Sequence, residues 1–78
     1  MFLVVTPAAG RIRLLPPRRF KHGREVVEAG QPVARLEQGE HHTLVRAAVG
    51  GTVASVLAIE GEPVRPGQPL YAIEPELP

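Results

Sequence analysis

The sequence predicts an all-β domain, built as a small sandwich or barrel of short strands. Nine prolines and eight glycines are spread along the 78 residues, and the segments between them are four to eight residues long. Short segments separated by regularly placed turn residues are typical of such a fold. No segment combines a helical period with capping residues. Residues 25–29 have room for one helical turn, which Gly30 and Pro32 would end.

Six segments are expected to form strands, each bounded by turn residues. Residues 2–5 are apolar and rich in valine, and residues 11–15 alternate between polar and apolar side chains. The segments at 31–37 and 68–74 each follow a glycine, which can supply the positive φ of a turn. The two remaining strands are expected at residues 43–47 and 52–59.

An internal repeat divides the chain into two similar halves. Residues 27–37 align without a gap with residues 64–74, sharing V-x-x-G-Q-P, an apolar alternation and a final glutamate. Residues 7–12 likewise correspond to residues 48–53, each being a turn followed by a strand that starts after a glycine. Such self-similarity indicates a repeated structural unit. Glu40 then lies in the connection between the two halves.

Composition indicates one small domain spanning residues 1–78. Apolar residues make up 44% of the chain, but only Phe2, Phe20 and Tyr71 are aromatic, so aliphatic side chains must build the core. Cysteine is absent, which excludes a disulfide framework and thiolate chemistry. A net charge of +1 argues against nucleic-acid binding, which usually requires a larger positive excess.

The first five residues are too few for a signal-peptide core or a membrane span, and Thr6 and Pro7 end this apolar segment. We therefore expect a cytoplasmic protein without membrane insertion.

Residues 14–23 break the symmetry of the two halves, because the first half has four more residues than the second between its turn glycine and its V-x-x-G-Q-P motif. This insertion is expected to form a protruding loop, stiffened by two successive prolines. It provides a candidate partner-binding loop: Arg18, Arg19, Phe20 and Lys21. The alternative is a solvated loop with Phe20 packed back onto the core.

Four segments, in this order and spacing, resemble the biotinyl/lipoyl carrier domain. They are residues 6–12, 27–37, 47–53 and 60–74, and the resemblance spans nearly the whole chain. The resemblance implies a flattened β-barrel, or barrel-sandwich hybrid (hammerhead), of two four-stranded sheets with quasi-twofold symmetry. The internal repeat points to the same symmetry independently.

In that family, biotin or lipoic acid is carried on a lysine at the tip of a β-hairpin, commonly within Glu-Ala-Met-Lys-Met or Glu-Thr-Asp-Lys-Ala. When Glu37 is aligned with the family's glutamate, Glu40 falls on the lysine, with Gly39 and His41 beside it at the hairpin tip. A carboxylate cannot form the amide link, because that reaction needs a nucleophilic amine. We therefore expect no cofactor. Lys21, the only lysine, is expected in the insertion, without the hairpin or flanking residues that attaching ligases recognise.

The neighbouring residues His41 and His42 are the candidates for metal binding. Two imidazoles and the Glu40 carboxylate, with Glu37 or His22 as further ligands, are suitable donors for zinc, nickel or copper. Adjacent strand residues point to opposite faces, however, so the pair does not easily converge on one ion. The alternative is a solvated polar turn, and we expect no metal site.

The sequence contains no recognisable catalytic motif. Its hydroxyl groups belong to no G-x-S-x-G element, and no glycine-rich phosphate loop is present. We expect a non-enzymatic, unmodified biotinyl/lipoyl-like module that serves as a docking or scaffold domain for another protein. The alternatives are a genuine biotin or lipoyl carrier protein of a carboxylase or dehydrogenase complex, and a small metal-binding protein that uses His41 and His42.

Overall fold

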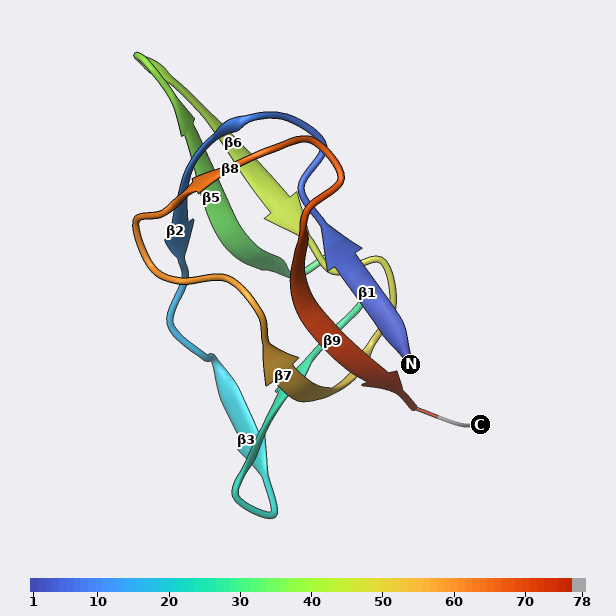
Figure 1. Ribbon diagram of the computed structural model, residues 1–78. Coiled ribbons are helices and arrows are strands. Elements are labelled where there is room, and N and C mark those ends of the chain that lie inside the picture. The colour runs from blue at the N-terminus through green and yellow to red at the C-terminus, as the bar shows by residue number, and fades with distance from the viewer. Residues whose placement is uncertain (77–78) are drawn as a thin grey trace.

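The computed structural model describes residues 1–76, which form two antiparallel β-sheets packed on each other (Figure 1). The five-stranded sheet contains, in spatial order, β1 (Phe2–Val5), β9 (Pro69–Pro75), β7 (Gly51–Val56), β4 (Arg24–Val27) and β3 (Arg19–Lys21). The four-stranded sheet contains β6 (His41–Arg46), β5 (Pro32–Gln38), β2 (Gly10–Leu14) and β8 (Pro63–Val64). The described residues include no helix long and apolar enough to cross a membrane. The predicted all-β sandwich is confirmed.

The two sheets are related by quasi-twofold symmetry. Strands β6, β5, β2 and β8 of one sheet correspond in order to β1, β9, β7 and β4 of the other. The registers correspond as well, because Gly10 pairs with Val64 in one sheet and Gly51 pairs with Val27 in the other. These four residues occupy equivalent places in the sequence halves, as the hammerhead prediction requires.

Strand β3 is the exception to this symmetry and corrects two expectations. Part of the predicted loop at residues 14–23 forms this strand, which pairs with β4 at the edge of the sheet. Strand β4 itself occupies residues that had room for a helical turn. The turn between them consists of His22 and Gly23, whose φ angles of 53° and 78° are those of a tight hairpin turn. One sheet therefore has five strands instead of the expected four.

The strand predicted at residues 2–5 is present as β1 with the same ends, and the other predicted strands are present with shifted ends. The strand expected at residues 52–59 ends at Val56, because the backbone N–H groups of Leu57 and Ala58 both donate to the Leu70 carbonyl, at 2.8 and 3.3 Å. The chain turns inward there, and Ala58 is buried. Strand β8 has two residues, too few to leave an alternation in the sequence.

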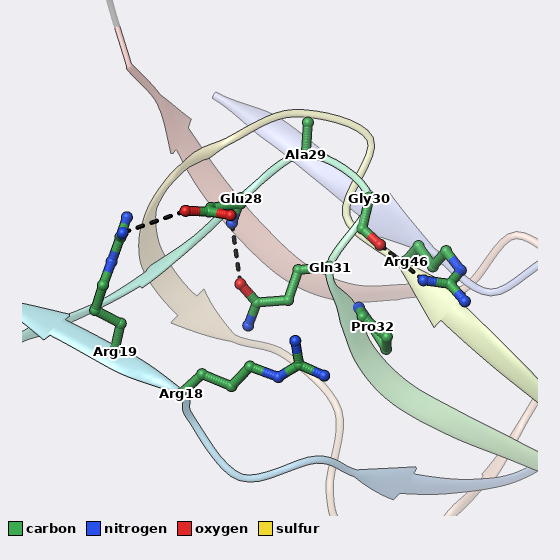
Figure 2. Close-up of a pocket in the computed structure, with 8 residues that line it drawn as sticks. All are labelled: Arg18, Arg19, Glu28, Ala29, Gly30, Gln31, Pro32 and Arg46. Atoms are coloured by element: carbon green, nitrogen blue, oxygen red, sulfur yellow. Dashed lines mark hydrogen bonds and ion pairs between the residues drawn. The ribbon is translucent and has the colours of Figure 1, made fainter.

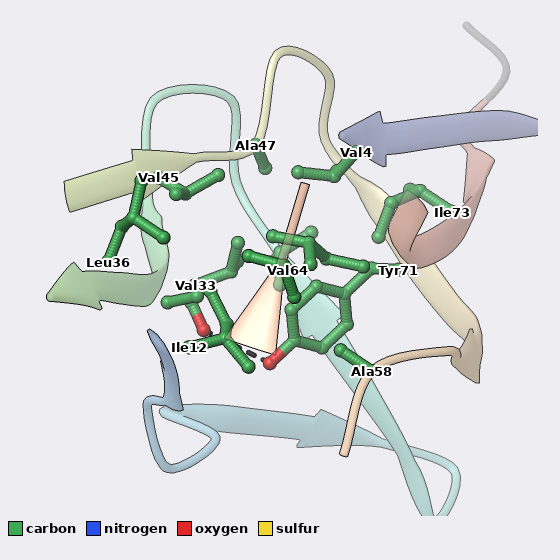
Figure 3. Close-up of a cluster of buried hydrophobic side chains, with 13 residues drawn as sticks. Val4, Ile12, Val33, Leu36, Val45, Ala47, Ala58, Val64, Tyr71 and Ile73 are labelled. Atoms are coloured by element: carbon green, nitrogen blue, oxygen red, sulfur yellow. Dashed lines mark hydrogen bonds between the residues drawn. The ribbon is translucent and has the colours of Figure 1, made fainter. Parts of the chain in front are cut away.

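The core lies between the sheets and is mainly aliphatic (Figure 3). Its largest fully buried side chains are Ile12, Leu36, Leu70, Ile73 and Thr6. Tyr71 contributes an aromatic ring, and its hydroxyl donates to the Val33 carbonyl at 3.0 Å. Burial raises the pKa of Tyr71 to about 12, so its hydroxyl stays protonated and bonded at neutral pH.

Figure 1 shows that the β5–β6 hairpin projects from one end of the molecule. The N-terminus and the end of β9 lie at the opposite end. The hairpin tip is thus well separated from the described chain ends.

Candidate functional site

The β5–β6 hairpin closes through a two-residue turn, Gly39 and Glu40. Gln38 and His41 pair directly across it. Gly39 has a φ of 61°, and Glu40 is not among the residues with positive φ. This combination is typical of a type II′ turn, which favours glycine at its first central position. Glu40 therefore lies at the tip of a hairpin whose residues 38–44 are exposed.

Ion pairs brace the base of this hairpin. Glu37 accepts from Arg13 Nε at 3.0 Å and from Arg35 Nη2 at 3.2 Å, while Arg13 Nη1 also reaches Glu60 at 3.1 Å. The hydrogen bond from Arg13 holds the pKa of Glu37 below its usual range. The Leu14 N–H, 2.6 Å from the Glu60 carboxylate, does the same for the pKa of Glu60. Both carboxylates are therefore charged at neutral pH, and the Glu37 interactions link β5 to β2.

A further hydrogen bond ties the hairpin to the turn before β2. Gln38 donates from Nε2 to the Ala9 carbonyl at 2.9 Å. Because residues 39–44 beyond this bond are exposed, the tip is available to another molecule while its base is fixed.

The two histidines do not share a face of the sheet. His42 pairs with Glu37 across the strands, whereas His41 pairs with Gln38, one position along. Successive strand residues point to opposite faces, so His42 lies beside Glu37 and His41 is directed away from both. His22 is in the separate β3–β4 turn. Within residues 1–76, no three His, Asp or Glu side chains are placed to hold a metal ion.

The four residues of the expected partner-binding loop have different surroundings. Arg18 and Arg19 line an open cleft of about 570 Å³ (Figure 2). Phe20 lies on β3 and is 60% exposed, so the alternative in which its ring packs on the core is wrong. The cleft also includes Arg46, which the sequence reasoning missed because this residue is distant from the insertion in the chain.

Lys21 lies in a hairpin, contrary to expectation. It ends β3, pairs with Arg24 and directly precedes the two-residue turn. The insertion is long enough to form both β3 and this turn, so part of it is a strand and not the expected loop. The lysine side chain is exposed.

Two packed sheets with quasi-twofold symmetry and a braced hairpin at one end define a barrel-sandwich module of the carrier type. Residues 4–73 match the sequence model of the biotin/lipoyl family, described as "Biotin-requiring enzyme". The chain belongs to this family, as the sequence resemblance predicted. No curated protein matches the chain.

Proposed function

We propose that this chain is a non-enzymatic, unmodified biotinyl/lipoyl-type module that acts as a docking or scaffold domain of a larger assembly. The observation that carries the proposal is the side chain in the β5–β6 turn. The family presents its prosthetic group on a hairpin lysine, and this hairpin has Glu40 in its turn. A carboxylate provides no amine for the amide link.

The bracing of the hairpin supports a role as a contact surface. Arg13 and Arg35 hold Glu37, and Gln38 is bonded to the neighbouring turn, so the part of the hairpin that carries the exposed tip is ordered. A surface that is already ordered loses little conformational entropy on binding, which favours docking of a partner.

The hydroxyl groups of the core support the non-enzymatic part of the proposal. Thr6 is fully buried and donates from Oγ1 to the Ala8 carbonyl at 2.7 Å, and the Tyr71 hydroxyl is bonded to Val33. Both hydroxyls are occupied in structural hydrogen bonds.

The second candidate is a genuine carrier that uses Lys21. The observation in its favour is the position of this lysine, exposed and directly before the two-residue turn of the β3–β4 hairpin. Its flanking residues, Phe20 and His22, differ from the family's attachment sequences. We therefore rank this function below docking.

Intact-mass measurement separates the two functions. The chain is coexpressed with a biotin ligase and, separately, with a lipoyl ligase, and a Lys21→Arg variant is treated in the same way. We expect the wild type to have its unmodified mass in both cases. A biotinyl or lipoyl mass on the wild type that is absent from Lys21→Arg would establish the carrier function and overturn the proposal.

A further inference from the structure

Two turns related by the quasi-twofold symmetry are built with the same hydrogen bonds. They span residues 28–31 and 65–68, and each ends in a glutamine, Gln31 or Gln68. In both turns the glutamine N–H donates to the carbonyl of the first residue at 3.0 Å. The glutamine Oε1 in turn accepts from the N–H of that first residue, at 3.0 Å in one turn and 3.1 Å in the other.

Arginines from other segments surround the first turn. Arg18 and Arg19 come from the insertion, which has no counterpart in the second half. Arg46 ends β6, and the residue at the corresponding pairing position of β1 is Val5. Since the second turn forms the same internal hydrogen bonds without such arginines, they are not required to build the turn.

The three arginines that line the open cleft differ in the hydrogen bonds and ion pairs that they make. Arg19 pairs with Glu28 at 3.2 Å, and Arg46 donates from Nη1 to the Gly30 carbonyl at 2.9 Å. Arg18 extends across the cleft in Figure 2 and makes no hydrogen bond or ion pair within residues 1–76. Three guanidinium groups and one carboxylate leave the cleft with a formal charge of +2.

We propose that this cleft binds an acidic segment of a partner protein through Asp or Glu carboxylates. The inference rests on the proposed docking function and names the chemistry of the partner. A guanidinium group matches a carboxylate with two parallel hydrogen bonds. The Arg19–Glu28 pair is solvent-exposed, with side-chain exposures of 58% and 71%, so it is weak and a partner carboxylate can replace Glu28.

The arrangement of donors favours a segment over a single phosphate. In Figure 2, Arg19 lies on one side of the turn and Arg46 on the other, and the Arg18 side chain extends between them, so the three charges are spread along the cleft. The backbone N–H of Gly30 donates to the Ala47 carbonyl at 2.7 Å, and that of the turn glutamine is also engaged. These amides are therefore not free to surround one anion. Several carboxylates along an extended chain fit the separated arginines better.

The test is an NMR titration of the ¹⁵N-labelled chain with a synthetic Glu-rich hexapeptide at low ionic strength. We expect shifts centred on residues 28–32 and on the cleft arginines, which added salt should reduce. Arg18→Ala should raise the Kd about threefold, and the double variant with Arg46→Ala about tenfold. Arg65→Ala, on the symmetry-related turn, is the matched control and should bind like the wild type.

Three results would overturn the inference. They are the absence of peptide-induced shifts in the cleft, equal weakening by Arg65→Ala and Arg18→Ala, and binding of inorganic phosphate as tightly as the peptide. Within residues 1–76 the Arg18 side chain makes no hydrogen bond or ion pair, so its variant tests binding without affecting the fold. A prosthetic-group mass on the wild type would contradict the docking function but leave the peptide result unchanged, so the two failures are distinguishable.

Discussion

Two glycines show how closely the paired strands constrain single residues. A Cβ atom on Gly10 would lie 2.6 Å from the carbonyl oxygen of Glu37. At the symmetry-related Gly51, a Cβ atom would overlap the carbonyl oxygen of Glu74. The neighbouring backbone, and not a turn conformation, therefore requires glycine at both positions.

Gly51→Ala should destabilise the domain by about 2 kcal/mol or more, because the added methyl group forces the β7–β9 backbone apart. Urea unfolding measures the loss. Gly67→Ala is the control, since its φ is 81° but its Cβ would meet nothing within 4 Å, and it should cost about 1 kcal/mol. Equal losses in the two variants would show that strand crowding is not the cause.

The lowered pKa of Glu37 predicts how stability depends on pH. The stability that the charged Glu37 carboxylate contributes is fully present above the pKa of this group in the unfolded chain, near 4.5. It is lost as the pH falls through the lower pKa of the folded protein. Glu37→Gln should therefore be less stable than the wild type at neutral pH, and the difference should shrink in acid. Urea midpoints across this range measure it. A difference that does not change with pH would contradict the assignment of the ion pairs to Glu37.

At the scale of elements, the apolar four-residue strand β1 and the strands of five or more residues could be predicted from sequence. β3 could not, because three exposed residues leave no pattern of burial. The signal was the His22-Gly23 dipeptide, whose positive φ values form the hairpin turn. β8 could not be predicted for a related reason: its two residues are too few to form a pattern, and they are a strand only because they pair with β2.

Strand β3 should detach from β4 without unfolding the sandwich, because β4 holds the buried Val26 and Val27 and stays paired with β7. Gly23→Val places a β-branched residue at a φ of 78° and should open the turn. Because β3 is exposed throughout, we expect global stability to change by less than about 1 kcal/mol while the amides of β3 lose exchange protection. Hydrogen exchange followed by NMR measures both. A loss of global stability in Gly23→Val as large as that of a core variant would contradict the view that β3 is an edge strand on which the sandwich does not depend.

At the scale of the whole molecule, the candidate sites were only partly predictable. The hairpin tip could be located, because the family resemblance aligns Glu37 with a glutamate that lies three residues before the attachment position. The arginine cleft could not be assembled, because Arg18, Gln31 and Arg46 come from separate segments that only the folded sheets bring together. These residues lie around one turn in the folded structure, and the linear sequence gives no sign of this proximity.

The quasi-twofold symmetry predicts that the turns at residues 28–31 and 65–68 contribute similar free energies to the stability of the domain. Gln31→Ala and Gln68→Ala each remove one hydrogen bond to a backbone N–H, with lengths of 3.0 and 3.1 Å. Each variant should lose about 0.5–1.5 kcal/mol, with similar values for the two. Chemical denaturation of both variants checks this. A loss at one turn that is several times the loss at the other would show that the halves share their geometry but not their energetics.

The central proposal is that the β5–β6 hairpin of this family member has Glu40 at the position of the attachment lysine and therefore carries no prosthetic group. The most direct test is the intact mass of Glu40→Lys beside the wild type, each coexpressed with biotin and lipoyl ligases. We predict that Glu40→Lys gains a prosthetic-group mass and that the wild type does not. A modified wild type, or a folded Glu40→Lys that neither ligase modifies, would contradict the claim.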